Sequence, residues 1–165
     1  MKNLACIFFA LTLLFSVPGC AKAVSPAIEP AHSPAPSAAA VNSEPQGLAL
    51  KLLLNGAEVP VIWQNCAAVD ALIADAAAAP ITVDLSLYGG WEQVGSLGRS
   101  YPQDDRQMTA VNGDIVLYQG DKIVLFYGSN SWSYTKIGKI DLPEEEVTTL
   151  LSKAPAVLTL LSAAS

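Results

Sequence analysis

Two short apolar runs joined by a tight turn place the strongest limit on how this chain can fold. Residues 115–118 and 123–127 are aliphatic and aromatic, and Gly120 and Asp121 stand between them. A glycine beside an aspartate signals a turn, and short runs that are apolar on both faces are typical of strands covered on both sides. We therefore predict a central hairpin in a buried sheet.

The rest of the chain from residue 47 onward carries similar strand and turn signals. Asn55-Gly56 predicts a hairpin with a type I′ turn. Pro60, which has no N–H, predicts that the second strand lies at a sheet edge or that this position faces away from a partner strand. About eight short strands with two helices predict a mainly β fold, a closed or nearly closed barrel capped by helices. The predicted strands cover residues 48–54, 57–63, 81–87, 107–111, 115–119, 122–127, 132–140 and 156–161, and residues 92–97 are expected to form a further short extended piece.

Two segments have helical periodicity. Asn65 is the expected N-cap of a helix that runs to about Ala78, and Asp141, three residues before a glutamate, is the expected N-cap of a second. Cys66 falls on the apolar stripe of the first helix, so we expect a buried structural thiol rather than a reactive nucleophile. The two stripes consist of Val69, Leu72, Ile73 and Ala76, and of Val147, Leu150 and Leu151.

The N-terminal residues are predicted to direct export. Lys2 precedes an uncharged, mostly apolar run over residues 4–17, which is typical of a signal peptide and too short to span a bilayer. The end of this segment, Val-Pro-Gly-Cys at 17–20, resembles the bacterial lipobox, which implies lipidation of Cys20. We expect a signal peptide over 1–20 and a lipid-anchored protein in the cell envelope, facing outside the cytoplasm, on the outer membrane in a diderm. Ordinary cleavage near this point and an uncleaved anchor are the alternatives.

Residues 21–46 consist mainly of alanine, proline and serine. This composition buries too little apolar surface to offset the entropy of ordering, so we predict a disordered tether. The folded domain is then expected over 47–165, which is long enough for one hydrophobic core.

Charge and residue usage argue against several classes of function. The net charge is −6 and Arg99 and Arg106 are the only arginines, which leaves no basic stripe for nucleic acid. The single histidine, His32, lies in the expected tether, so the domain has no histidine base, triad or metal ligand of its own. Glutamates 144–146 fit a first helical turn, where the helix dipole favours acidic residues. We expect no metal and no cofactor.

Three stretches carry candidate binding residues. Residues 88–91 and 128–134 combine glycine, polar groups and aromatic rings, which suits them to hold a peptide or small ligand, although turns and lining aromatics would look the same. The polar loop 100–106 is a third candidate because loops often carry function, although Asp104 and Asp105 are ordinary solvated groups in the simplest interpretation. The candidates are Tyr88, Trp91, Tyr101, Arg106, Asn130, Trp132 and Tyr134.

The stretch from Asn112 to Asp141, which begins NGDIVLYQGDKIVLFYGSN, resembles the signature region of bacterial cyclophilin-like-fold proteins, a family of small barrels. Residues 88–95, YGGWEQVG, resemble its upstream half. The resemblance spans about residues 50–160 and implies an eight-stranded barrel capped by helices, but no activity. True cyclophilins are prolyl isomerases with a signature similar to F-x-x-x-F-M-x-Q-G-G-D, a catalytic arginine and a pocket histidine. This chain lacks that string, so no catalytic residue is carried over.

Three functions are compatible with these observations. The leading hypothesis is a non-catalytic, envelope-tethered module that binds a peptide or a small ligand. The second is weak prolyl isomerisation, with Arg106 as the donor to the amide nitrogen. The third is a structural subunit of an envelope complex.

Overall fold

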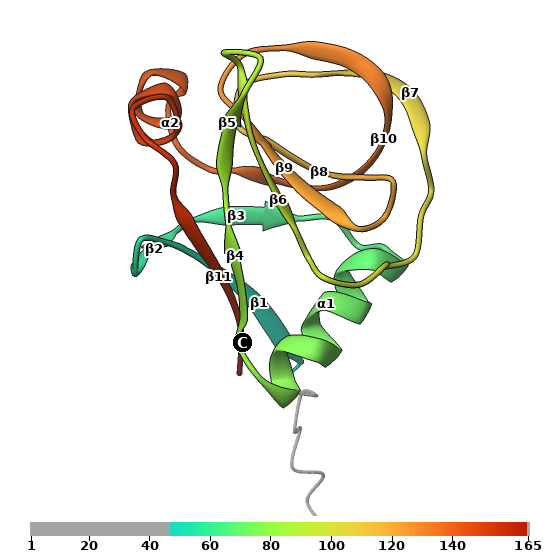
Figure 1. Cartoon of the computed structure of the whole chain (residues 1–165). Coiled ribbons are helices and arrows are strands. Elements are labelled where there is room, and N and C mark those ends of the chain that lie inside the picture. The colour runs from blue at the N-terminus through green and yellow to red at the C-terminus, as the bar shows by residue number, and fades with distance from the viewer. Residues whose placement is uncertain (1–46, 165) are drawn as a thin grey trace, which may run out of the picture. The chain divides into compact units, whose positions relative to one another are not determined.

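Two antiparallel sheets and two helices make up residues 47–164, the part of the chain that the computed structural model describes (Figure 1). The predictions for the signal peptide, Cys20 and the tether lie outside these residues. The strands are β1 (Leu48–Leu54), β2 (Ala57–Val59), β3 (Val61–Trp63), β4 (Ile81–Asp84), β5 (Ser86–Tyr88), β6 (Glu92–Ser96), β7 (Arg106–Ala110), β8 (Asp114–Tyr118), β9 (Lys122–Phe126), β10 (Asn130–Ile140) and β11 (Val157–Ala164); the helices are α1 (Ala67–Ala78) and α2 (Glu144–Leu151).

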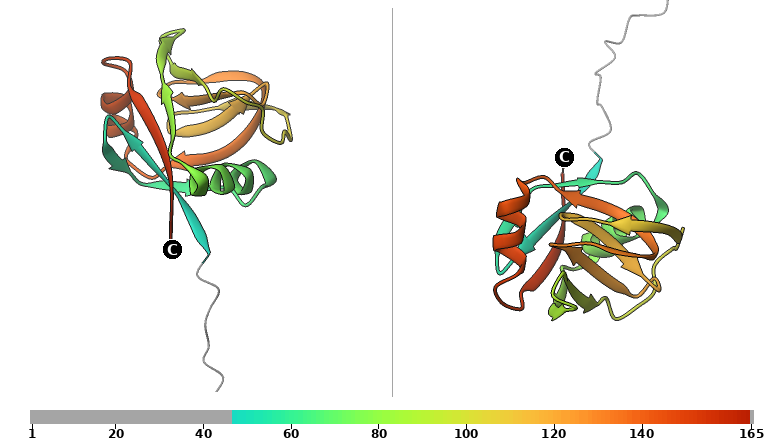
Figure 2. Two further views of the ribbon diagram at one scale, coloured as in Figure 1. Left: turned by 60° about the horizontal axis from the view of Figure 1, so that its bottom comes forward. Right: turned by 90° about the horizontal axis from the view of Figure 1, so that it is seen from above.

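The first sheet has the strand order β2-β1-β11-β4, and the second has the order β3-β10-β8-β9-β6-β5, with β7 added on β10. In the first sheet β1 pairs with β11 along its whole length, from Leu48 opposite Ala164 to Leu54 opposite Leu158 (Figure 2). Helix α1 packs against these two strands. In the second sheet β8 and β9 are central, as their apolar sequences predict.

The mainly β class with two helices is confirmed, but the closed eight-stranded barrel is wrong. The strands form a four-stranded and a seven-stranded sheet with no strand pairing between them. The chain leaves the first sheet at Pro60, which has no N–H to continue the ladder, and changes sheet again at Leu85. The two sheets pack without joining at Gly95, where a Cβ would lie only 2.8 Å from the carbonyl oxygen of Asp84.

Side chains from both sheets and both helices form the main core. Alternation along β8 and β9 sends Ile115, Leu117, Ile123 and Leu125 into this core, together with Val147 and Leu151 of α2. The Nε1 atom of Trp63 on β3 donates a 2.6 Å hydrogen bond to the carbonyl oxygen of Leu50 on β1, which holds the edges of the two sheets together.

A second, smaller apolar cluster lies on the opposite face of the second sheet. It contains Ala110, Val116, Val124, Phe126 and Tyr134. Burial on both faces explains why β8 and β9 consist almost entirely of apolar residues.

The predicted turn is confirmed and the two predicted helix caps are wrong. Asn55 and Gly56 both have positive φ, 50° and 83°, as a type I′ turn requires. Helix α1 has Cys66 and not Asn65 as its N-cap, and α2 has Pro143 and not Asp141; neither cap makes a side-chain hydrogen bond.

Cys66 is partly buried against the main core, rather than fully buried as predicted. Its φ of −152° is extended, so this residue precedes the helix and does not follow the periodicity of the apolar stripe. The side chain therefore contacts the core from one side only.

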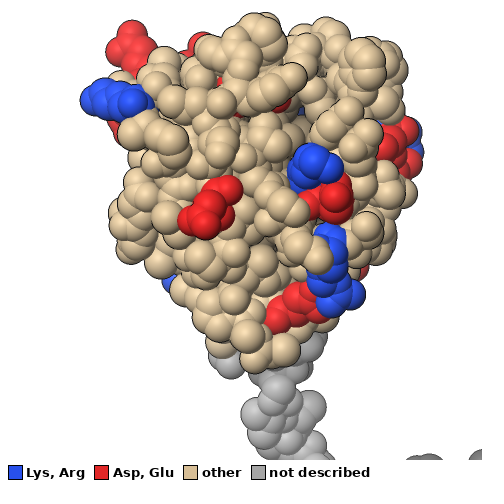
Figure 3. Space-filling model, in the orientation of Figure 1, with Lys and Arg blue, Asp and Glu red and all other residues tan. Residues whose placement is uncertain are grey.

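Charged side chains are sparse on the face shown in Figure 3, and basic groups there lie beside acidic ones. Within the described residues, no helix is long and apolar enough to cross a membrane.

Candidate functional site

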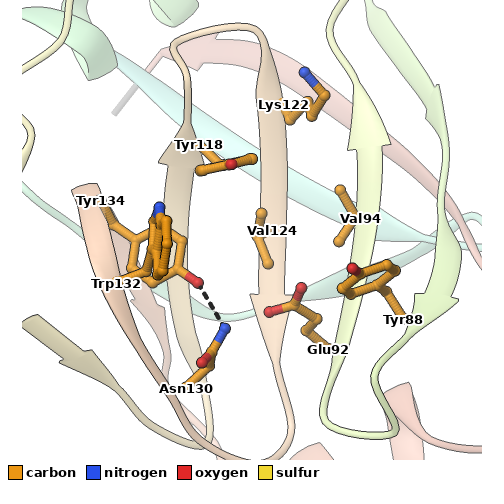
Figure 4. A pocket seen from close by; sticks show the side chains of 9 residues that line it. All are labelled: Tyr88, Glu92, Val94, Tyr118, Lys122, Val124, Asn130, Trp132 and Tyr134. Atoms are coloured by element: carbon orange, nitrogen blue, oxygen red, sulfur yellow. Dashed lines mark hydrogen bonds between the residues drawn. The ribbon is translucent and has the colours of Figure 1, made fainter.

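A cavity of about 400 Å³ lies on the face of the second sheet that carries the smaller apolar cluster (Figure 4). Residues from five strands line it: Tyr88, Glu92, Val94, Tyr118, Lys122, Val124, Asn130, Trp132 and Tyr134. The cavity is thus formed by regular strands, which hold side chains more rigidly than loops do.

The floor of the cavity consists of neighbouring strands in register. Val94 of β6 pairs with Val124 of β9, and Tyr118 of β8 pairs with Lys122 of β9. Since alternate residues of a strand point to the same face, Glu92 shares the face of Val94, and Lys122 shares that of Val124. Glu92 and Lys122 therefore stand toward opposite ends of an apolar floor, as Figure 4 shows.

One wall of the cavity is the first half of β10. Residues 135–139 of this strand pair with β8, but residues 130–134 pair with β7 instead. This change of partner places Asn130, Trp132 and Tyr134, which alternate along the strand, beside the floor. Tyr88 of β5 stands on the other side, beyond Glu92 (Figure 4).

Glu92 has the most unusual environment in the cavity. The residue is only 5% exposed, and its Oε2 atom is buried without a hydrogen-bond partner. Burial raises the pKa of this carboxyl from 4.5 to about 7. Its neutral and ionised forms are therefore both populated near neutral pH, so it can donate or accept a hydrogen bond.

The polar groups of the wall are partly paired with each other. Asn130 Nδ2 donates a 3.0 Å hydrogen bond to the Tyr134 hydroxyl. The pKa of Tyr134 is raised, chiefly by burial and then by the charge of Glu92. The ring of Tyr134 packs edge to face against Phe126 and Tyr118, with centroids 5.7 and 6.1 Å away. These contacts fix the orientation of Tyr134.

Lys122 already has a counter-ion. Its Nζ atom lies 2.8 Å from Oδ1 of Asp121 and 5.9 Å from the centroid of the Tyr118 ring. Tyr88 and Trp132, by contrast, are exposed aromatic residues that line the cavity and are open to a ligand.

The structure brings together four of the seven candidates named from the sequence: Tyr88, Asn130, Trp132 and Tyr134. Trp91 does not line the cavity; its ring packs on Gly89, and its carbonyl oxygen accepts hydrogen bonds from the N–H groups of Tyr127 and Gly128.

The other two candidates also lie outside the cavity. Tyr101 is buried in the main core, and its hydroxyl donates a 2.8 Å hydrogen bond to Asp75. Burial, followed by this contact, raises its pKa to about 12. Arg106 pairs in register with Tyr134 on β10, but its side chain is exposed, and its Nη2 atom lies 2.9 Å from Oδ2 of Asp104.

The polar loop before β7 is attached to β10 and does not line the cavity. The N–H of Asp104 donates to the Thr135 hydroxyl, which donates in turn to Asp105. Among the described residues, no three His, Cys, Asp or Glu side chains are grouped to hold a metal ion.

Sequence reasoning missed five of the nine lining residues: Glu92, Val94, Tyr118, Lys122 and Val124. The predicted two-residue turn at Gly120-Asp121 would place Gln119 opposite Lys122, whereas the structure pairs Tyr118 with Lys122, so the predicted register is wrong by one residue. Glu92 carried no signal of its own, because a single carboxylate in a short strand is ordinarily exposed. Its burial depends on neighbours that are distant in sequence.

Comparison with known proteins gives one family. A sequence model of the cyclophilin-like family matches residues 52–160, which is more than half of the chain and nearly all of the described domain. No curated protein matches the chain.

Proposed function

The chain belongs to the cyclophilin-like family, and we propose that its folded domain is a non-catalytic module that binds a small ligand or a short peptide in the cavity on the second sheet. The observation that carries this proposal is a preformed cavity of about 400 Å³, lined by aromatic rings and a few polar groups. Ligand pockets in proteins typically have about 300–1,000 Å³ and this kind of lining.

The exposed aromatic residues support binding. Trp132 is 57% exposed although it borders the cavity, and Tyr88 on the opposite side is more exposed still. Large aromatic side chains with a polar atom are favoured as ligand contacts because they bury much area with few rotatable bonds.

Arg106 gives no support to prolyl isomerisation. A donor to the nitrogen of a bound prolyl amide would have to face the cavity, whereas the guanidinium is engaged by Asp104 through both Nε and Nη2. We therefore place binding and not isomerisation first.

We also propose that the module is held in the cell envelope through a lipid on Cys20 and the segment 21–46. The support is the apolar run over 4–17 that ends in Val-Pro-Gly-Cys. Metabolic labelling with a fatty acid, followed by membrane fractionation, tests this. Labelling of the native chain and none of Cys20→Ser is expected; equal labelling of both would contradict the anchor.

A ligand screen tests the binding function directly. The Cys20→Ser chain would be titrated with a library of small aromatic molecules and proline-containing peptides, with tryptophan fluorescence and NMR as readouts. Trp132→Ala should lose at least about tenfold in affinity for any ligand found. Ile62→Ala, at an equally exposed residue on the edge strand β3, should change nothing. No ligand tighter than about 1 mM with well-folded protein would contradict the proposal.

A further inference from the structure

The carboxyl of Glu92 is a buried polar group that faces a cavity and has no partner. No hydrogen bond or ion pair within the described residues involves its side chain, and Oε2 is fully buried. Buried carboxylates in folded proteins are normally paired or hydrogen bonded, because an unpaired charge away from water is costly. A group placed in this way at a cavity wall is suited to receive a donor from a bound molecule.

No basic side chain of residues 47–164 neutralises this carboxyl. Within that range Lys122 is the only basic residue that lines the cavity, and its Nζ atom is paired with Asp121. Lys122 stands opposite Ser96, four residues along β6 from Glu92. At about 3.3 Å for each residue of a strand, the two positions are about 13 Å apart. The charge that the lining leaves uncompensated is therefore negative and lies at one end of the cavity.

The rings around Glu92 suit the same ligand chemistry. Tyr88 and Tyr134 lie on either side of the carboxyl, and Trp132 stands beside Tyr134 (Figure 4). Aromatic faces attract cations through their quadrupoles, and they also bury apolar groups. An anion bound at this end of the cavity would be repelled both by the Glu92 carboxylate and by the electron-rich faces of these rings.

We propose that the cavity selects an amine with an apolar or aromatic body, whose ammonium group donates to the Glu92 carboxylate while the body packs between the rings of Tyr88, Trp132 and Tyr134. This inference rests on the proposed binding function and adds the chemical class of the ligand.

Three probes of nearly equal shape separate the ligand classes. These are 2-phenylethylamine, 2-phenylethanol and 3-phenylpropionate, which carry a cation, a neutral hydroxyl and an anion. Each would be titrated by NMR into the Cys20→Ser chain at pH 8, where Glu92 is mainly ionised. The amine should bind about ten- to a hundredfold more tightly than the alcohol, and the anion most weakly.

The variant Glu92→Gln should remove this preference. It keeps the shape of the side chain but not the charge, so the affinity for the amine should fall by about tenfold or more while the affinity for the alcohol stays unchanged. Glu145→Gln, on the exposed face of α2, is the matched control and should leave both affinities unchanged.

A second measurement compares the affinity of the wild-type protein for the amine at two pH values. An alkylamine keeps its proton up to pH 8, so the wild-type affinity for the amine should be about tenfold lower at pH 6 than at pH 8, while that for the alcohol stays constant. The other titratable residues that line the cavity are Tyr88 of β5, Tyr118 of β8, Lys122 of β9 and Tyr134 of β10. Three charged residues on the same strands do not line it: Asp114 of β8, which is paired with Lys136 of β10 at 2.7 Å, and the exposed Lys139 of β10. Absence of the pH effect in Glu92→Gln would assign it to Glu92.

The outcomes distinguish the two levels of the proposal. Equal affinities for amine and alcohol, or a preference for the anion, would overturn the amine selectivity and leave a binding module. Failure of all three probes, together with an empty library screen, would overturn the binding function itself.

Discussion

Replacing Glu92 by glutamine should stabilise the domain at neutral pH and remove part of its pH dependence. Burial raises the pKa of Glu92 from 4.5 to about 7. Between these values the folded protein keeps a proton on this carboxyl that the unfolded chain has released. The free energy of unfolding therefore falls as the pH rises from about 4.5 to about 7. Above about pH 7 the titration of Glu92 changes it no further, because both states have released the proton. At about 1.4 kcal/mol for each pH unit, the fall is about 3 kcal/mol.

Urea unfolding followed by circular dichroism between pH 4.5 and 8 measures this effect. Glutamine has nearly the same shape as glutamate and no charge, so Glu92→Gln and the wild type should be similar in stability at the acidic end. At pH 8 the variant should be more stable by about 3 kcal/mol. Glu145→Gln, at an exposed residue, should stay within about 1 kcal/mol of the wild type throughout.

Two results would refute this reasoning. A difference between Glu92→Gln and the wild type that is the same at pH 5 and pH 8 would show that Glu92 has an ordinary pKa. A variant less stable than the wild type at pH 8 would show that the carboxylate has a favourable partner in the folded protein.

Three further substitutions test the packing around the site. Gln93→Leu should cost about 3 kcal/mol or more in urea unfolding, because the buried amide of Gln93 bonds to three backbone groups between residues 151 and 156; a loss below about 1 kcal/mol would contradict this. Gly95→Ala should cost about 1–3 kcal/mol in thermal unfolding, because its Cβ would lie against the carbonyl oxygen of Asp84; unchanged stability would show that β4 and β6 separate freely. Trp132→Ala should change the free energy of unfolding by no more than about 0.5 kcal/mol, because the side chain is mostly exposed; a larger loss would make Trp132 a structural residue.

The elements that local patterns determine were predictable from the sequence. Asn55-Gly56 specifies its turn because both residues tolerate positive φ, and the apolar runs of β8 and β9 required central strands. The edge position predicted from Pro60 is confirmed, since β2 before it and β3 after it each lie at the edge of a sheet. The sequence did not indicate that Pro60 divides one predicted strand between two sheets.

The features that depend on distant pairing were not predictable. The number of strands suggested closure into a barrel, but closure requires hydrogen-bonded ladders between the edges of the two sheets. Instead, β4 and β6 only pack against each other at Gly95. Asn65 and Asp141 were wrongly predicted as N-caps, because the path of the preceding chain determines the residue at which each helix begins. Glu92 was overlooked because its burial depends on β10, far along the chain, which turns from β8 to β7 beside it.

The pairing of β1 with β11 also bears on when this domain can fold. These strands are neighbours along the full length of β1, yet they are the first and last strands of the described chain. Contacts between such distant segments form slowly, because a long loop must close before they contribute to stability. The first sheet cannot be completed until residues 157–164 have been synthesised. We therefore expect β1 of a nascent chain to lack its long partner strand, and the main core to stay unformed, until β11 has left the ribosome.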